Sequence, residues 1–259
     1  FCPALGIAIP VGKDSLSMKT SWREAIESRK MVAPLSLIVS ALAPVRDVRR
    51  TWTPQLRTDQ GPTSLLMIDL GNGRDRLGGS CLAQVYGKIG QTAPDCDDPQ
   101  QLARFFAAMV ELRETNLVIA YHDRSDVGLF ATLVEMAFAG HCGLDVVLPA
   151  SSGSSPVAQL FAEELGAVLQ VRTADEWRVS AVLAKHGLDA LSARIGKPVA
   201  SADGADANGL RVRIAAGDQR IDESWVELRR AWSETSWQLR RLRGGAERGE
   251  RPGPLTRRG

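Results

Sequence analysis

One six-residue stretch, YHDRSD at residues 121–126, constrains the fold of this chain more than any other. An apolar run (residues 117–120) precedes it, and a long apolar segment (residues 127–140) follows it. This pattern predicts a buried strand, an acidic turn and a buried helix. Helix starts attract anions, and carboxylates are natural ligands of Mg²⁺. The stretch therefore predicts a site for a metal ion and phosphate, with helix capping by Ser125 or Asp126 as the alternative.

The order of apolar patterns after residue 63 predicts an α/β fold, an α+β two-layer sandwich of ordinary domain size. Gly61 and Pro62 mark the best boundary in the chain. We expect residues 1–60 to be the end of an incomplete N-terminal subdomain. Residues 61–222 then form a C-terminal subdomain, and residues 223–244 an amphipathic helix. Residues 245–259 have almost no apolar content, which predicts a disordered tail.

Within the first 60 residues, the apolar runs at 4–9 and 34–43 predict strands, and the charged residues 22–30 predict an irregular segment. The chain begins with Phe1 in strand-like sequence, which indicates a fragment or a processed piece. The loop after residue 9 contains a Gly-Lys pair but lacks the remaining residues of a phosphate-binding P-loop. Lys13 can meet an anion as a point charge, or it is an ordinary solvated lysine.

Charge and cysteine content argue against several classes of protein. The net charge of +2 arises in the tail, because residues 240–259 hold seven arginines against two glutamates and residues 1–239 sum to −3. The main body therefore has no nucleic-acid footprint. Four cysteines without a C-x-x-C pair suit a reducing compartment. We expect no signal peptide and no membrane span, and hence a cytoplasmic protein.

Two residues of the apolar segment 127–140 and its end stand out. A carboxylate is rarely buried without a partner, so we expect Glu135 either to meet a partner in the interior or to line a cleft. His141 follows the segment directly and reads as a helix-end group.

Six blocks of the sequence together resemble phosphoribosylformylglycinamidine synthase of the large type. They are IPVGKDSLSMKT (9–20), TPQL (53–56), LGGS (77–80), AYHDRSD (120–126), EMAFAGHCG (135–143) and EELGAVLQV (163–171). Any one block alone is weak, but six blocks in register over residues 1–243 make the resemblance specific.

The resemblance implies a fold, a reaction and a set of site residues. The chain is similar to an aminoimidazole-ribonucleotide-synthetase-like C-terminal subdomain preceded by the end of an N-terminal one. The family uses ATP to convert formylglycinamide ribonucleotide and glutamine into the formylglycinamidine ribonucleotide, with glutamate, ADP and phosphate as the other products. Asp123 matches a Mg²⁺ ligand of the family and Ser125 a nucleotide contact. Lys13, Asp14 and Ser15 match a loop at the nucleotide or substrate cleft.

The chain also departs from the family pattern. Val127 stands where the family has glycine, Ala162 stands where it has asparagine, and the basic tail replaces the linker to the glutaminase domain. A Cys with a suitably spaced His and Glu is absent, so the partners implied are a glutaminase domain and the missing synthetase half. We expect the fragment to be inactive alone. Two alternatives remain: a non-catalytic scaffolding half with a decayed nucleotide site, and another kinase-like member of the superfamily.

Overall fold

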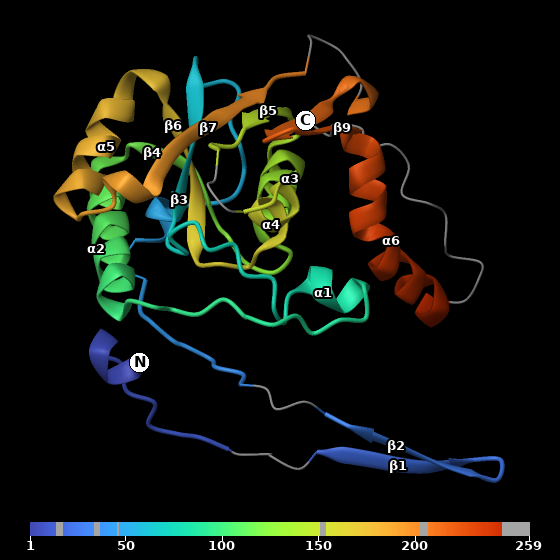
Figure 1. Ribbon diagram of the computed structural model, residues 1–259. Coiled ribbons are helices and arrows are strands. Elements are labelled where there is room, and N and C mark those ends of the chain that lie inside the picture. The colour runs from blue at the N-terminus through green and yellow to red at the C-terminus, as the bar shows by residue number, and fades with distance from the viewer. Residues whose placement is uncertain (14–17, 34–36, 46, 151–153, 202–206, 245–259) are drawn as a thin grey trace. The chain divides into compact units, whose positions relative to one another are not determined.

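The computed structural model describes residues 1–13, 18–33, 37–45, 47–150, 154–201 and 207–244. The chain divides into two compact units, Phe1–Thr51 and Trp52–Gly259 (Figure 1). The division falls before the expected boundary at residues 60 and 61, because Trp52 and Leu56 pack against the cores of the second unit. Asp14, Ser15 and the tail 245–259 lie outside the described residues.

The first unit is built around one antiparallel hairpin. Strand β1 (Lys19–Glu24) pairs with β2 (Glu27–Val32), and short 3-10 helices lie at η1 (Cys2–Leu5) and η2 (Val48–Arg50). The strands expected at residues 4–9 and 34–43 are wrong for the residues described there, and the segment expected to be irregular forms most of the hairpin. An apolar run predicts a strand because strands bury such residues. None of the described residues 1–51 is buried, so the prediction has no basis there.

The second unit contains a seven-stranded mixed sheet in the order β4-β6-β3-β7-β5-β8-β9. Neighbouring strands are antiparallel except for the parallel pair β5 and β8. The strands are β3 (Thr63–Asp69), β4 (Val118–Asp123), β5 (Gly143–Val147), β6 (Gly166–Arg172), β7 (Ser192–Val199), β8 (Arg211–Ala216) and β9 (Gln219–Ser224). The predicted α/β class is confirmed.

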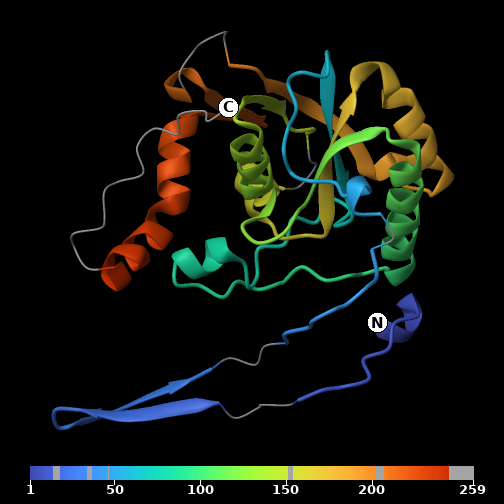
Figure 2. The ribbon, with the colours of Figure 1, turned by 180° about the vertical axis from the view of Figure 1, so that it is seen from behind.

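Helices cover both faces of this sheet (Figures 1 and 2). On one face lie α2 (Pro99–Thr115) and α5 (Glu176–Lys185), and on the other lie α3 (Gly128–Gly140), α4 (Pro156–Phe161) and α6 (Trp225–Gly244). The short α1 (Cys81–Val85) and the 3-10 helices η3 (Thr173–Asp175), η4 (Asp189–Leu191) and η5 (Ala207–Gly209) connect other elements.

Alternation along the central strand explains the two apolar cores. In β3, Leu65 belongs to the core under α3 and α6, whereas Leu66 and Ile68 belong to the core under α2 and α5. Successive side chains of a strand point to opposite faces, so one strand supplies both layers. Trp225 anchors α6, because its buried indole N–H donates to the carbonyl of Ala137 at 3.1 Å.

No helix in the described ranges is long and apolar enough to cross a membrane. His141 is the C-cap of α3 in a left-handed conformation, as the sequence predicted for a helix-end group.

Candidate functional site

The turn between β4 and α3 exposes both residues that the sequence assigned to metal and nucleotide. Asp123 is the last residue of β4 and its side chain is 63% exposed. Ser125 is also exposed, and its carbonyl accepts a hydrogen bond from Gly128 N at 2.9 Å. The structure therefore brings Asp123 and Ser125 together on one open turn. A hard carboxylate oxygen and a hydroxyl donor at a helix start are suited to a metal-bound phosphate.

The helix start is not capped in the way the alternative reading required. The N-cap of α3 is Val127, and none of the side chains described there caps the helix, neither Ser125 nor Asp126. Instead, Glu163 accepts hydrogen bonds from the backbone N–H of Val127 at 2.9 Å and of Cys81 at 2.8 Å through the same oxygen, Oε1. One carboxylate therefore ties the starts of α3 and α1 together, a role that sequence spacing does not reveal.

Val127 occupies a backbone conformation that suits glycine. Its φ is 67°, in the left-handed region, and the next residue, Gly128, has a φ of 72°. A β-branched side chain is strained there. Glycine, which the resemblance implied at this position, would adopt this conformation without strain, so Val127 costs stability in the turn itself.

Between the two exposed residues, Arg124 points into the molecule. Its Nη2 donates to Asp69 Oδ1 at 2.7 Å and to the carbonyl of Leu165 at 3.2 Å, and its Nε donates to the carbonyl of Glu164 at 2.6 Å. Asp69 also accepts hydrogen bonds from the backbone of Gly71 at 3.0 Å and Gly73 at 2.8 Å. This charge-assisted network holds the β4–α3 turn against the end of β3.

A second buried pair supports the same edge of the sheet. Glu164 is almost fully buried and accepts from Arg76 at 2.6 Å (Nε) and 2.7 Å (Nη2). The hydrogen bonds to Glu164 raise the pKa of Arg76, with a further contribution from Asp97. Sequence spacing does not reveal the ion pairs Arg124–Asp69 and Arg76–Glu164, although Arg124 and Glu164 lie within the blocks that carry the resemblance.

Glu135 meets partners, but at the surface and not in the interior as the sequence predicted, because its side chain is 35% exposed. His122 Nε2 lies 3.0 Å from Glu135 Oε2, and the indole N–H of Trp232 donates to Glu135 Oε1 at 2.9 Å. The other ring nitrogen of His122 lies 2.8 Å from the carbonyl oxygen of Asp123. The carboxylate on α3 thus links α6 to the residue that precedes Asp123.

Other predicted site residues are not part of this turn. Lys13 is exposed in the first unit, so its contact with the nucleotide stays a prediction, and Asp14 and Ser15 lie outside the described residues. The described part of the chain contains no group of three or more His, Cys, Asp or Glu side chains that could hold a metal ion. Asp123 alone still fits Mg²⁺, which is commonly held by one or two carboxylates with phosphate and water completing its shell.

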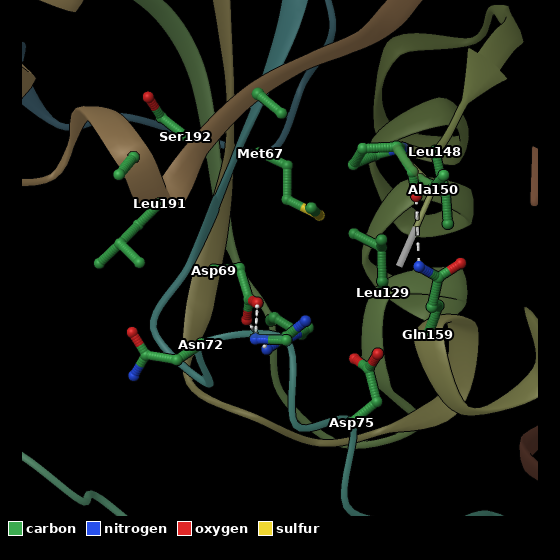
Figure 3. A pocket seen from close by; sticks show the side chains of 15 residues that line it. Met67, Asp69, Asn72, Asp75, Leu129, Leu148, Ala150, Gln159, Leu191 and Ser192 are labelled. Carbon is green, nitrogen blue, oxygen red and sulfur yellow. Dashed lines mark hydrogen bonds and ion pairs between the residues drawn. The ribbon is translucent and has the colours of Figure 1, made fainter. Parts of the chain in front are cut away.

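A cavity of about 550 Å³ lies beside the turn at the same edge of the sheet (Figure 3). Met67, Leu129, Leu148 and Leu191 form apolar walls, and Asp69, Asn72, Asp75, Arg124, Gln159 and Ser192 contribute polar groups. Burial raises the pKa of Asp75, and the charge of Asp69 adds to the increase, whereas a hydrogen bond with Ser154 and the charge of Arg124 oppose it.

Two family models match the chain. Residues 1–44 match the FGAR-AT PurM_N-like domain, and residues 66–209, more than half of the chain, match the AIR synthase related protein, C-terminal domain. The chain belongs to the AIR synthase related protein family. The family resemblance carried by the six sequence blocks is thereby confirmed.

Solved structures with the same fold include PurL from Thermotoga maritima in several complexes. The complex with ADP has a TM-score of 0.53 at 14% identity, and the complex with AMPPCP has 0.52 at 15%; each match covers 70% of this chain and 27% of that chain. The complex with FGAR has a TM-score of 0.51 at 13% identity and covers 70% of this chain and 30% of that chain. This chain therefore spans less than a third of the length of these proteins.

Proposed function

We propose that this chain is the end of the synthetase region of a large-type phosphoribosylformylglycinamidine synthase, acting in the cytoplasm in de novo purine biosynthesis. The single observation that carries the proposal is the succession, in one chain, of an FGAR-AT PurM_N-like match and an AIR synthase related C-terminal match. The whole enzyme would be a carbon–nitrogen ligase with glutamine as amido donor. It would convert formylglycinamide ribonucleotide, glutamine and ATP into the amidine, glutamate, ADP and phosphate.

In this proposal, the β4–α3 turn supplies part of a Mg²⁺–nucleotide site. The Asp123 carboxylate holds the ion, which neutralises phosphate charge when bound. The Ser125 hydroxyl donates a hydrogen bond to a phosphate oxygen at the helix start. Phosphoryl transfer depends mainly on positioning and charge neutralisation, so rigid support of this turn by Arg124 and Glu163 matters more than any covalent role.

The remaining parts of the site would come from other segments. The loop with Lys13, Asp14 and Ser15 is proposed to line the nucleotide or substrate cleft. The other synthetase half and a glutaminase domain, which supplies ammonia, are the proposed partners. The chain by itself would bind nucleotide without catalysing the reaction.

Calorimetry with AMPPCP tests the metal assignment. We expect the chain to bind the nucleotide in the presence of Mg²⁺, and Asp123→Asn to weaken that binding about tenfold or more, equivalent to about 1.4 kcal/mol. Without Mg²⁺, the variant and the parent chain should bind equally. Asp218→Asn is the matched control, because Asp218 is exposed in the β8–β9 turn. Equal Mg²⁺-dependent binding by Asp123→Asn and the parent would refute the assignment.

The substitution Val127→Gly distinguishes a working nucleotide site from the alternative of a non-catalytic scaffold with a decayed site. If the site has decayed, Val127→Gly leaves nucleotide affinity unchanged. If the strained turn still forms a working site, relief of the strain at a φ of 67° should improve affinity for Mg²⁺–AMPPCP.

A further inference from the structure

The cavity beside the β4–α3 turn has the dimensions of a small-molecule site. Its volume of about 550 Å³ lies within the range of roughly 300–1,000 Å³ that is typical of ligand pockets. The lining combines the end of β3 and its turn with residues of α3, α4 and the start of β7, all within the second unit. Leu129 and Leu148 are buried there, so part of the wall is dry and rigid.

The two carboxylates of the cavity have different roles. Asp69 is already satisfied, because it accepts hydrogen bonds from Arg124 and from the backbone of Gly71 and Gly73. Asp75 carries no such set: a hydrogen bond with Ser154 is its side-chain partner, and no cation among the described residues forms an ion pair with it. Asp75 is also held in a left-handed conformation, with a φ of 47°, at the cavity edge (Figure 3).

The charge of the lining disfavours anions. Arg124 is the one cation among the described lining residues, and its side chain is only 3% exposed. Its Nε and Nη2 atoms donate to Asp69 and to two backbone carbonyls, so they are not available to a phosphate. Two carboxylates against one committed guanidinium leave a net negative cavity. An anionic ligand would meet the charge of Asp75, while the one cation among the described lining residues is already paired with Asp69.

Hydrogen-bond acceptors at the edge complement the apolar walls. The side-chain nitrogen of Gln159 donates to the carbonyl of Pro149 at 3.2 Å, and its Oε1 accepts no hydrogen bond from the described residues. Asp75 and Gln159 both line the cavity, together with Met67 and Leu191 (Figure 3). A flat apolar body with N–H donors at one end would fill the walls and satisfy both acceptors.

We propose that this cavity binds a flat organic ligand that carries N–H donors and no negative charge, an amidine or amine in preference to a neutral amide, and that it rejects carboxylate and phosphate. Asp75 is the anchoring group, and Gln159 is the second acceptor. This proposal rests on the lining of the cavity alone, so it does not depend on the nucleotide role of Asp123 and Ser125.

Three probes of matched shape and different charge test the proposal: benzamidine, benzamide and benzoate, with binding followed by calorimetry or by NMR of the ¹⁵N-labelled chain. We expect benzamidine to bind at least tenfold more tightly than benzoate, with benzamide between them. Asp75→Asn should weaken benzamidine about tenfold and leave benzamide nearly unchanged. The exposed control Asp218→Asn should change neither.

A second variant keeps the test decisive if Asp75→Asn alters the fold. Gln159→Glu adds a carboxylate to the same edge, so it should strengthen benzamidine and weaken benzoate severalfold. The proposal is overturned if benzoate or inorganic phosphate binds the parent chain as tightly as benzamidine, if none of the probes binds, or if both variants bind benzamidine like the parent. Loss of Mg²⁺–AMPPCP binding in Asp123→Asn with unchanged benzamidine binding would support two separate sites.

Discussion

The β4–α3 turn contains neighbouring residues that differ in burial and in their contacts. Asp123 and Ser125 are exposed, and Asp123 lies 3.5 Å from a ring nitrogen of His122, whereas Arg124 between them is buried and donates through Nε and Nη2 to Asp69 and two carbonyls. The buried contacts of Arg124 hold the backbone of the turn, and the exposed side chains contribute little to that support. The difference teaches that stability and ligand binding are separable in this turn, residue by residue.

The largest effect on stability is expected when the buried charge of Arg124 is removed. Arg124→Met keeps much of the side-chain volume but leaves Asp69 and the carbonyls of Glu164 and Leu165 without their donor. Loss of one partner from a buried ion pair typically costs about 3–5 kcal/mol, so we expect a decrease of about 3 kcal/mol in the free energy of unfolding, measured with urea. Asp123→Asn, on the exposed side, should stay within about 0.5 kcal/mol of the parent. Equal losses of unfolding free energy in the two variants would show that the buried and exposed residues of the turn contribute alike to stability.

The next test compares the two neighbouring left-handed residues at the helix start. A Cβ added at Gly128 would lie 2.6 Å from the carbonyl oxygen of Ala162, so Gly128→Ala should cost about 2 kcal/mol or more through both contact and backbone strain. Val127→Gly removes a β-branched side chain from a φ of 67°, and we expect a gain of about 1 kcal/mol. Thermal unfolding of the two variants should show shifts of opposite sign. A loss in Val127→Gly would mean that its side chain contributes more than the strain costs.

A smaller effect is expected where α6 meets α3. Trp232→Phe removes the N–H that donates to Glu135 but keeps a ring for the guanidinium of Arg229, which lies 4.3 Å from the ring centroid of Trp232. Because Trp232 is largely exposed, we expect a loss of about 0.5 kcal/mol in the free energy of unfolding. Trp177→Phe, at another exposed tryptophan, is the control. An equal response in the two variants would show that the bond to Glu135 contributes nothing.

The smallest effect concerns Asp75 and depends on pH. Its pKa is raised in the folded state, above the ordinary value of 3.8, so the folded chain holds the proton more tightly than the unfolded chain does. Ionised Asp75 therefore destabilises the fold at neutral pH, and protonation removes this penalty as the pH falls through the raised pKa. Asp75→Asn should melt slightly above the parent at pH 7, and the difference should vanish below about pH 3.8. A difference that persists at low pH would contradict this cause. Asn also tolerates the left-handed conformation at this position.

Sequence patterns predicted the second unit well where burial is one-sided and periodic. The apolar residues of 97–113 recur at helical spacing, and the apolar runs at 64–70 and 166–171 have the length of strands. The structure has α2 (Pro99–Thr115), β3 and β6 at these places. The same reasoning failed in the first unit, where β1 and β2 are mostly polar and every residue in them is exposed. Periodicity reports which face is buried, so it carries little information where no described residue is buried.

The sequence by itself determined that an acidic turn joins a buried strand to a buried helix, and it put Asp123 and Ser125 on that turn. It could not determine what Arg124 contacts or that Asp75 lines a cavity. Those facts depend on register: β6 pairs with β3 at Asp69 opposite Gly166, and with β4 at Asp123 opposite Ala167. Residues 55 positions apart thereby become neighbours, and the arginine finds its carboxylate. Only the tertiary structure decides such contacts, because strand pairing, and not local sequence, brings the end of β3 close to the end of β4.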